Sequence, residues 1–240
     1  MIRLVFRVAA VVVLLLAALV GLGGNRILRR AHNPWPRRFL SGAAPLLGIR
    51  VRTTGQRASG TVLLLANHVS WIDIVALGAA TGSAFVGHDG LAAVPLVRWF
   101  ARLNDTVFIA RHDRAGVAQQ VEQLRTALAE MGTVCLFPEG TTADGKSLLP
   151  FKSSLLGALE PLPAGVVIQP VRLDFGDEVP GFAWIGEESG LANFRRVVAR
   201  ARPVTVTVQF LPPLAGAALA NRKTITAAAR DAIAAAMADG

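Results

Sequence analysis

A cluster of polar residues, NHVSWID at positions 67–73, directly follows the apolar run TVLLLA at positions 61–66. Within this cluster, His68 stands five residues before Asp73. Neutral imidazole accepts a proton near neutral pH, and a carboxylate on its other nitrogen fixes the tautomer and stabilises the imidazolium. The pair therefore suits a general base and the group that orients it. The alternative is a surface histidine with satisfied polar atoms beside an aspartate that caps a helix.

Two further polar clusters also follow apolar runs. FPEGTT at 137–142 places a glycine where the backbone can approach a ligand and where amide donors can face an oxyanion or a phosphate. Arg111, in the cluster that follows TVFIA at 106–110, could pair with an anionic head group. The alternatives are an ordinary turn for the first cluster and a surface arginine for the second.

Other kinds of chemistry find less support in the sequence. A metal site built on His68 and Asp73 with His88 or His112 lacks close ligand spacing, so we predict none. Cys135 lies in the apolar run TVCLF, which favours a core residue over a nucleophile. The sequence has no G-x-S-x-G nucleophile motif, no Walker-type glycine loop and no dinucleotide-binding glycine motif in a suitable context. A base without a protein nucleophile favours direct transfer onto a substrate hydroxyl.

The formal net charge of +9 is concentrated at the N-terminus. Ten arginines and no acidic residue precede Asp73, while the other 15 basic residues nearly balance the 16 acidic ones. This pattern favours an anionic membrane surface over nucleic acid, because a nucleic-acid-binding domain spreads basic and aromatic residues over its fold. The chain has only three lysines and no tyrosine, so we predict no nucleic-acid partner.

The N-terminal segment VAAVVVLLLAALVGLGG at 8–24 carries no charge. With residues 4–6 included and Arg7 snorkelling, it approaches the ~20 residues that span a bilayer. We expect a single membrane anchor, spanning or partly embedded; the alternatives are a cleaved signal peptide and a buried helix. More arginines follow the segment than precede it, so a spanning helix would leave the main domain on the cytoplasmic side. We therefore predict an anchor with a basic collar at 1–38 and a catalytic domain at 39–240.

The rest of the chain alternates between strand-like and helix-like patterns. Since parallel strands with helical connections form one sheet covered by helices, we predict a single α/β sheet flanked by helices, with ligands beyond the carboxyl ends of the strands. Ser70 is expected to cap the first helix of the domain, and Gly132 to end the second. We predict strands at 61–66, 106–110, 133–137, 166–173 and 204–210, and helices at 73–80, 115–131, 153–160 and 223–238.

Four blocks of the sequence together resemble the 1-acylglycerol-3-phosphate (lysophosphatidate) acyltransferase family. Asn67-His68 with Asp73 is similar to the N-H-x-x-x-x-D motif of that family, and VFIAR at 107–111 is similar to its second block. FPEG at 137–140, followed by Thr141, resembles the third block, and VIQPV at 167–171 resembles the fourth. The blocks occur in order and at family-like separations.

The resemblance implies roles for these residues. His68 would be the catalytic base and Asp73 the residue that orients it. Arg111 would contact a phosphate of the acceptor, and Pro170 would shape the acyl or donor site. The other substrate-binding residues would be Asn67, Phe137, Pro138, Glu139, Gly140 and Thr141.

The sequence departs from the family pattern at Thr142, where the third block often ends in arginine. An arginine would supply a bidentate phosphate contact, and Lys146 or Lys152 could supply only a point charge. Threonine at this position also resembles family members that act on lyso-ornithine lipids, whose acceptor has no phosphate.

The resemblance implies an acyltransferase that moves a fatty acyl group from acyl-CoA or acyl carrier protein, as co-substrate and without a cofactor, to the free hydroxyl of a lysolipid. We expect 1-acylglycerol-3-phosphate as the acceptor and phosphatidic acid as the product, with lyso-ornithine lipid as the alternative. A lipid hydrolase or thioesterase, and a non-catalytic membrane lipid-binding protein, are the competing hypotheses. The oligomeric state and the donor are left open.

Overall fold

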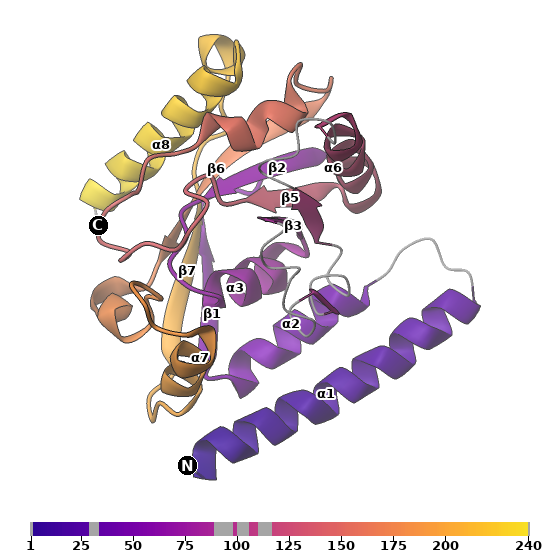
Figure 1. The fold of residues 1–240 in the computed structure, drawn as a ribbon, viewed down its shortest axis with the longest axis vertical. Helices are drawn as coiled ribbons and strands as arrows, with labels where there is room; N and C mark the ends of the chain where they lie inside the picture. The colour runs from indigo at the N-terminus through magenta and orange to yellow at the C-terminus, as the bar shows by residue number, and fades with distance from the viewer. Residues whose placement is uncertain (1, 29–33, 89–97, 100–105, 110–116, 240) are drawn as a thin grey trace.

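The computed structural model describes residues 2–28, 34–88, 98–99, 106–109 and 117–239 (Figure 1). The chain folds into one mixed β-sheet with helices on both faces, which confirms the predicted fold class. The strands are β1 (Ile49–Thr54), β2 (Thr61–Ala66), β3 (Ala84–His88), β4 (Val107–Ile109), β5 (Thr133–Leu136), β6 (Val166–Asp174) and β7 (Val204–Phe210). The α-helices are α1 (Ile2–Ile27), α2 (Trp35–Leu46), α3 (Ile72–Thr81), α6 (Val117–Met131), α7 (Gly190–Val198) and α8 (Arg222–Ala238), and the 3₁₀ helices are η1 (Ser153–Leu159), η2 (Gly176–Gly181) and η3 (Gly216–Leu219).

Within the described residues, the strand order across the sheet is β1-β7-β6-β2-β5-β3-β4. Neighbouring strands are parallel except for β6 and β7, which pair antiparallel. Strand β2 occupies the centre between β5 and β6. Since β2 and β5 run in the same direction, the segments that follow them emerge side by side at one edge of the sheet.

The continuous apolar run of β2 is explained by helices that cover both of its faces. Leu64 and Ala66 belong to a core on the side of α2, α3 and α7, whereas Leu63 and Leu65 belong to a core beneath α6 and α8. Strand β7 instead alternates buried valines with partly exposed Thr and Gln, as its sequence predicts.

Several predicted boundaries agree with the structure. Helix α6 ends at Gly132, whose φ of 68° lies in the left-handed region and whose N–H donates to the Leu128 carbonyl. Helix α8 begins one residue before its predicted start, after Asn221 closes a capping box with Thr224.

Among the described residues, four α-helices and strands were not predicted, namely α2, β1, β3 and α7, and neither were the 3₁₀ helices η2 and η3. Strand β1 reads IRVRTT and lies at the sheet edge with most of its side chains partly or fully exposed, so it lacks an apolar run. Helix α2 begins at Trp35, inside the predicted basic collar. Because α2 continues through residue 38, the predicted boundary between 1–38 and 39–240 falls inside this helix. The division itself stays a prediction.

Helix α1 packs along the domain (Figure 1). Its inner side chains, including Leu4, Val11 and Leu15, contact the core beside α2. Arg7 does not snorkel: its guanidinium donates hydrogen bonds to the carbonyls of Val198 and Arg200, at the C-terminus of α7. Residues 2–25 of this helix are long and apolar enough to cross a membrane, judged by length and composition.

Candidate active site

The predicted base and the third sequence block lie together at the carboxyl edge of the sheet. His68 follows β2, and Phe137 follows the neighbouring strand β5. Their rings stack, with centroids 4.1 Å apart and an interplanar angle of 17°. Phe137 is buried and thus forms the floor under the imidazole. Arg111, which belongs to the second block, lies outside the described residues.

His68 and Asp73 form the predicted hydrogen-bonded pair. His68 Nδ1 lies 2.7 Å from Asp73 Oδ2, with the His68 side chain 19% exposed and the Asp73 side chain 0% exposed. A carboxylate can only accept, so Nδ1 must carry a proton in this contact. In neutral imidazole the lone pair then belongs to Nε2. The arrangement prepares Nε2 to accept a proton from another molecule.

Asp73 is held in place by the backbone as well as by the histidine. Its Oδ2 accepts from the N–H groups of Val69 at 2.6 Å and Ser70 at 2.9 Å, in the first turn of α3. The N-cap residue of α3 is Trp71 and no side chain caps the helix, so the predicted Ser70 cap is wrong. The Asp73 carboxylate instead holds the loop that precedes the helix. Ser70 Oγ and Asp73 Oδ1 are buried without a hydrogen-bond partner among the described residues.

Glu139 joins the first and third blocks. Its side chain is only 1% exposed, and Oε1 accepts from the His68 N–H at 2.8 Å. Oε2 accepts from the N–H of Leu149 at 2.9 Å. Burial raises the pKa of Glu139, while these two hydrogen bonds oppose the rise. Glu139 thus fixes the backbone of His68, the candidate base.

The buried position of Glu139 predicts how stability depends on pH. The raised pKa means that the folded protein binds this proton more tightly than the unfolded chain, whose ordinary value is 4.5. Stability should therefore fall as pH rises from 4.5 through the folded pKa. We expect wild type to lose stability relative to Glu139→Gln across this range, measured by thermal unfolding at a series of pH values. A difference between the two proteins that does not vary with pH would contradict this.

Two more backbone hydrogen bonds fix the loop that carries His68. The His68 carbonyl accepts from the N–H of Ala143 at 2.7 Å, and the Val69 carbonyl accepts from the N–H of Trp184 at 3.0 Å. The Thr142 hydroxyl donates to the Trp184 carbonyl. Trp184 therefore links the loop after β2 to the loop after β5.

Other predicted site residues also make structural contacts. Asn67 is buried, and its amide both donates to the Leu173 carbonyl and accepts from the Leu173 N–H. The Pro138 carbonyl accepts from the N–H of Lys152, and the Gly140 N–H donates to the Phe137 carbonyl. Thr141 is exposed at the same turn. Substrate binding by these residues stays a prediction.

Pro170 lies on the opposite face of the sheet from Phe137. It is buried in β6, where Ile168 belongs to the core beneath α8 and Val171 to the core beside α3. Since side chains alternate along a strand, Pro170 shares a face with Ile168, opposite to Phe137. The structure does not bring Pro170 and His68 together on one face of the sheet.

The roles of Trp184, Ala143 and Leu149 were not predicted from the sequence. Ala143 and Leu149 act through backbone N–H groups, and Trp184 acts through its backbone N–H and carbonyl, so residue type gives no signal. An internal network supports the Trp184 segment: buried Asn193 accepts from the Trp71 indole and donates to Glu188. Hydrogen bonds from Arg196 and Asn193 lower the pKa of Glu188 to about 2.

Two side chains of the types that form covalent enzyme intermediates are inaccessible. Ser70 and Cys135 are fully buried, and burial together with the negative charge of Asp73 raises the pKa of the Cys135 thiol. Over the described part of the chain, no three His, Cys, Asp or Glu side chains gather closely enough to hold a metal ion. Neither Ser70 nor Cys135 is therefore accessible to a substrate as a nucleophile.

Comparisons with known proteins agree with this geometry. A family model described as Acyltransferase matches residues 48–174. The lyso-ornithine lipid O-acyltransferase of Rhodobacter capsulatus is 31% identical over 96% of this chain and 88% of its own length. The 1-acyl-sn-glycerol-3-phosphate acyltransferase of Neisseria gonorrhoeae is 30% identical over 70% of this chain and 66% of its own length.

The crystal structure of the 1-acyl-sn-glycerophosphate (LPA) acyltransferase PlsC from Thermotoga maritima has the same fold. It matches with a TM-score of 0.64 and 20% identity, over 99% of this chain and 97% of that one. The structural match shows the fold, and the sequence relatives and the family model show in addition that the chain is an acyltransferase. The chain belongs to the 1-acylglycerol-3-phosphate acyltransferase family and is an O-acyltransferase that acts on lysolipids.

Proposed function

We propose that this enzyme transfers a fatty acyl group from a thioester donor, acyl-CoA or acyl carrier protein, to the hydroxyl of lyso-ornithine lipid. The observation that carries the catalytic part is the 2.7 Å contact of His68 Nδ1 with Asp73, which leaves Nε2 as the base. This choice of acceptor is supported by the threonine at position 142 and by relatives that align with nearly the whole chain.

In the proposed reaction, His68 Nε2 takes the proton of the acceptor hydroxyl while its oxygen attacks the thioester carbonyl. Asp73 stabilises the imidazolium that forms. The tetrahedral intermediate collapses with loss of the thiolate, which takes the proton back from the imidazolium. The products are a diacyl lipid and a free thiol, and the histidine returns to its neutral state.

The side chain of Thr142 supports an acceptor without a phosphate. An arginine would extend from this position as a bidentate phosphate ligand. Thr142 instead turns its hydroxyl to the Trp184 carbonyl within the fold. The relatives in Rhodobacter capsulatus and Brucella abortus, 31% and 32% identical over 96% and 92% of this chain, are lyso-ornithine lipid O-acyltransferases.

1-Acylglycerol-3-phosphate is the second candidate acceptor, because the Neisseria relative acts on it and shares 30% identity. Purified enzyme in lipid vesicles, given each acceptor in turn with the same labelled donor, tests the choice. We expect a higher kcat/KM for lyso-ornithine lipid. A higher kcat/KM for 1-acylglycerol-3-phosphate would reject our acceptor and favour the second candidate.

The outward face of α1 supports binding to a membrane. Its exposed apolar side chains recur at the spacing of one helical face, so they form a continuous stripe. The opposite side of the helix contacts α2 and α7, which favours a helix embedded along the membrane surface. The arginine-rich sequence that follows favours the anionic cytoplasmic surface of a membrane. The large exposed apolar residues of the stripe are Ile2, Val5, Phe6, Val12, Val13, Leu16, Val20 and Ile27.

Placing charges on this stripe is expected to release the enzyme from membranes. Phe6, Val13 and Val20 are 74%, 66% and 78% exposed, so their replacement by glutamate should leave the fold intact. Losing three large apolar side chains removes several kcal/mol of membrane binding, at about 1.5–3 kcal/mol each. We expect the triple variant to stay in the supernatant when anionic vesicles are sedimented.

The matched control adds three glutamates elsewhere, with Gln123→Glu, Thr126→Glu and Ala235→Glu on exposed faces of α6 and α8. This control should sediment with vesicles as wild type does. Sedimentation of the α1 variant with the vesicles would show that another surface binds the membrane.

A further inference from the structure

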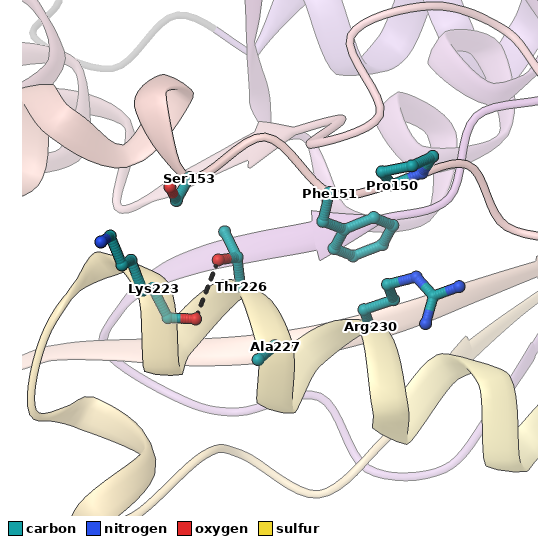
Figure 2. A pocket seen from close by; sticks show the side chains of 7 residues that line it. All are labelled: Pro150, Phe151, Ser153, Lys223, Thr226, Ala227 and Arg230. Atoms are coloured by element: carbon teal, nitrogen blue, oxygen red, sulfur yellow. Dashed lines mark hydrogen bonds between the residues drawn. The ribbon is translucent and has the colours of Figure 1, made fainter.

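Helix α7 packs on the same face of the sheet as the His68–Phe137 pair. Phe137 and the inner side chains of α7 belong to one core. The groove of about 360 Å³ between the segment 150–153 and α8 (Figure 2) lies on the other face, where Phe151 packs against the core beneath α6 and α8. Side chains of α7 can therefore reach the surroundings of His68, whereas the lining of this groove faces away from them.

Asn193 of α7 is a fully buried polar side chain with a partner for each of its polar atoms. Its Oδ1 accepts from the Trp71 indole N–H at 3.0 Å. Its Nδ2 donates to Glu188 Oε2 at 2.8 Å and to the Ala183 carbonyl at 3.3 Å. An indole N–H can only donate and a carboxylate can only accept, so these contacts fix the orientation of the amide. A fully satisfied polar group in a core holds its partners in one arrangement, which an apolar side chain of the same size does not.

The partners of this amide reach the loop between β2 and α3 at two points. Trp71 lies within the loop, as the N-cap residue of α3. The N–H of Trp184 donates to the Val69 carbonyl at 3.0 Å, and its indole N–H donates to the Glu188 carbonyl at 2.7 Å. Because Glu188 is also a partner of Asn193, both connections lead from the loop to the same buried amide.

The two connected positions lie on either side of Ser70, in the part of the loop that holds Asp73. The Asp73 Oδ2 accepts from the N–H groups of Val69 and Ser70 as well as from His68 Nδ1. A shift of the loop at Val69 or Trp71 would therefore move the carboxylate relative to the imidazole. A misplacement of about 1 Å can cost ~10²-fold in rate.

Arg196 fixes the far end of this network. Its Nε donates to Glu188 Oε1 at 2.9 Å, and its Nη2 donates to Glu188 Oε2 at 2.6 Å. The same guanidinium donates to the carbonyls of Gly181 at 2.7 Å and Ala183 at 3.0 Å. Because a bidentate contact between arginine and carboxylate is specific in geometry, Glu188 is held where its carboxylate accepts from Asn193.

We propose that Asn193 is a positioning residue for acyl transfer. It holds the loop between β2 and α3 in the arrangement that brings His68 Nδ1 within 2.7 Å of Asp73 Oδ2. Asn193 is fully buried, so it acts on the reaction only through Trp71 and the segment 183–188. The proposal rests on the proposed function, in which His68 is the base.

The test compares kcat for Asn193→Leu and Val197→Ala, measured with saturating substrates at a temperature where unfolding curves show both variants folded. Leucine is close in size to asparagine and forms none of these hydrogen bonds. Val197 is buried in the same core without a polar side-chain atom, so its truncation weakens the packing of α7 and leaves the network in place. We expect Asn193→Leu to lower kcat by about 10- to 100-fold with KM for lysolipid unchanged. Val197→Ala should keep the wild-type kcat.

Proton NMR of the full chain in detergent reports on the geometry directly. A proton shared between His68 Nδ1 and the Asp73 carboxylate in a short hydrogen bond resonates far downfield. We expect this resonance in wild type and in Val197→Ala, and we expect Asn193→Leu to lose it.

Trp71→Phe tests the same connection with a smaller change. It removes the indole N–H and keeps an aromatic ring beside Phe194. We expect a lower kcat, and a double variant with Asn193→Leu that loses less than the product of the two single effects, because both changes break one hydrogen bond. Independent effects that multiply in full would contradict a path through Trp71.

Three results would overturn the role of Asn193 alone. They are a wild-type kcat in folded Asn193→Leu, a loss of kcat with the downfield resonance retained, and equal losses of kcat in Asn193→Leu and Val197→Ala. Full kcat in His68→Ala would instead overturn the proposed base and this proposal together. Transfer to 1-acylglycerol-3-phosphate but not to lyso-ornithine lipid would reject only the proposed acceptor, and the same comparison of variants then uses the accepted lipid.

Discussion

Replacing His68 with alanine is expected to lower kcat for acyl transfer by about 10²- to 10⁴-fold, the usual contribution of a general base. The backbone of residue 68 keeps its hydrogen bonds to Glu139 and Ala143, so the fold should survive with the loss of one ring contact to Phe137. The measurement is diacyl lipid formed from labelled donor under saturating substrates.

The KM for the lysolipid should change little in His68→Ala, because the lost interaction belongs to the transition state. A matched thermal unfolding curve checks that the variant is folded. If folded His68→Ala turns over as fast as wild type, the histidine is not the base, and the hypothesis of a non-catalytic lipid-binding protein regains support.

Asp73→Asn is expected to lower kcat by about 10³-fold. The negative charge of Asp73 stabilises the imidazolium by about 4 kcal/mol at an effective dielectric constant of 20, and this corresponds to ~10³-fold in rate. The amide oxygen can still accept from Val69, Ser70 and His68, so the geometry of the loop should be kept. The comparison of kcat between wild type and variant, at one pH and with one donor, measures this effect.

The same change should also destabilise the protein. The amide NH₂ takes the place of Oδ1, which is buried without a partner among the described residues, and an unsatisfied buried group costs about 1–3 kcal/mol. Denaturant unfolding measures this cost separately from kcat. An Asp73→Asn variant with wild-type kcat would mean that the aspartate only holds the loop before α3.

The sequence predicted the strands and helices whose signals lie within a few neighbouring residues. Strands β2 and β5 are apolar throughout because both faces are covered, and α6 and α8 have clear terminal signals. Strand β1 was missed because its arginines and threonines suit an exposed edge strand. Its place is set by pairing with β7, about 150 residues later in the chain, which no local pattern predicts.

The His68–Asp73 pair was predicted because the residue types themselves, an imidazole and a nearby carboxylate, indicate a base and its partner. The residues that hold this pair in place could not be identified as such from the sequence. Glu139 and Asn67 belong to the recognised blocks, yet both are buried and bind backbone atoms of residues that lie far from them in sequence. Residue types alone do not separate a ligand-binding polar group from one that ties loops together. That distinction requires the tertiary structure.

The contact between Thr142 and Trp184 is another one that only the tertiary structure reveals. From the sequence, Thr142 stands out only as a departure from the family pattern. In the structure, its hydroxyl joins the loop after β5 to the segment that also holds Val69. Position 142 is therefore linked, through Trp184, to the loop that carries His68.

The central claim is direct transfer of the acyl group to a lysolipid hydroxyl through the His68–Asp73 pair. The most direct measurement is a paired assay in vesicles with labelled acyl donor and lyso-ornithine lipid, in which diacyl lipid, free thiol and free fatty acid are quantified together for wild type and His68→Ala. We predict one thiol released for each diacyl lipid formed by wild type, no thiol release without acceptor, and almost no product from His68→Ala. Free fatty acid released without acceptor, or equal diacyl product from both proteins, would contradict the claim.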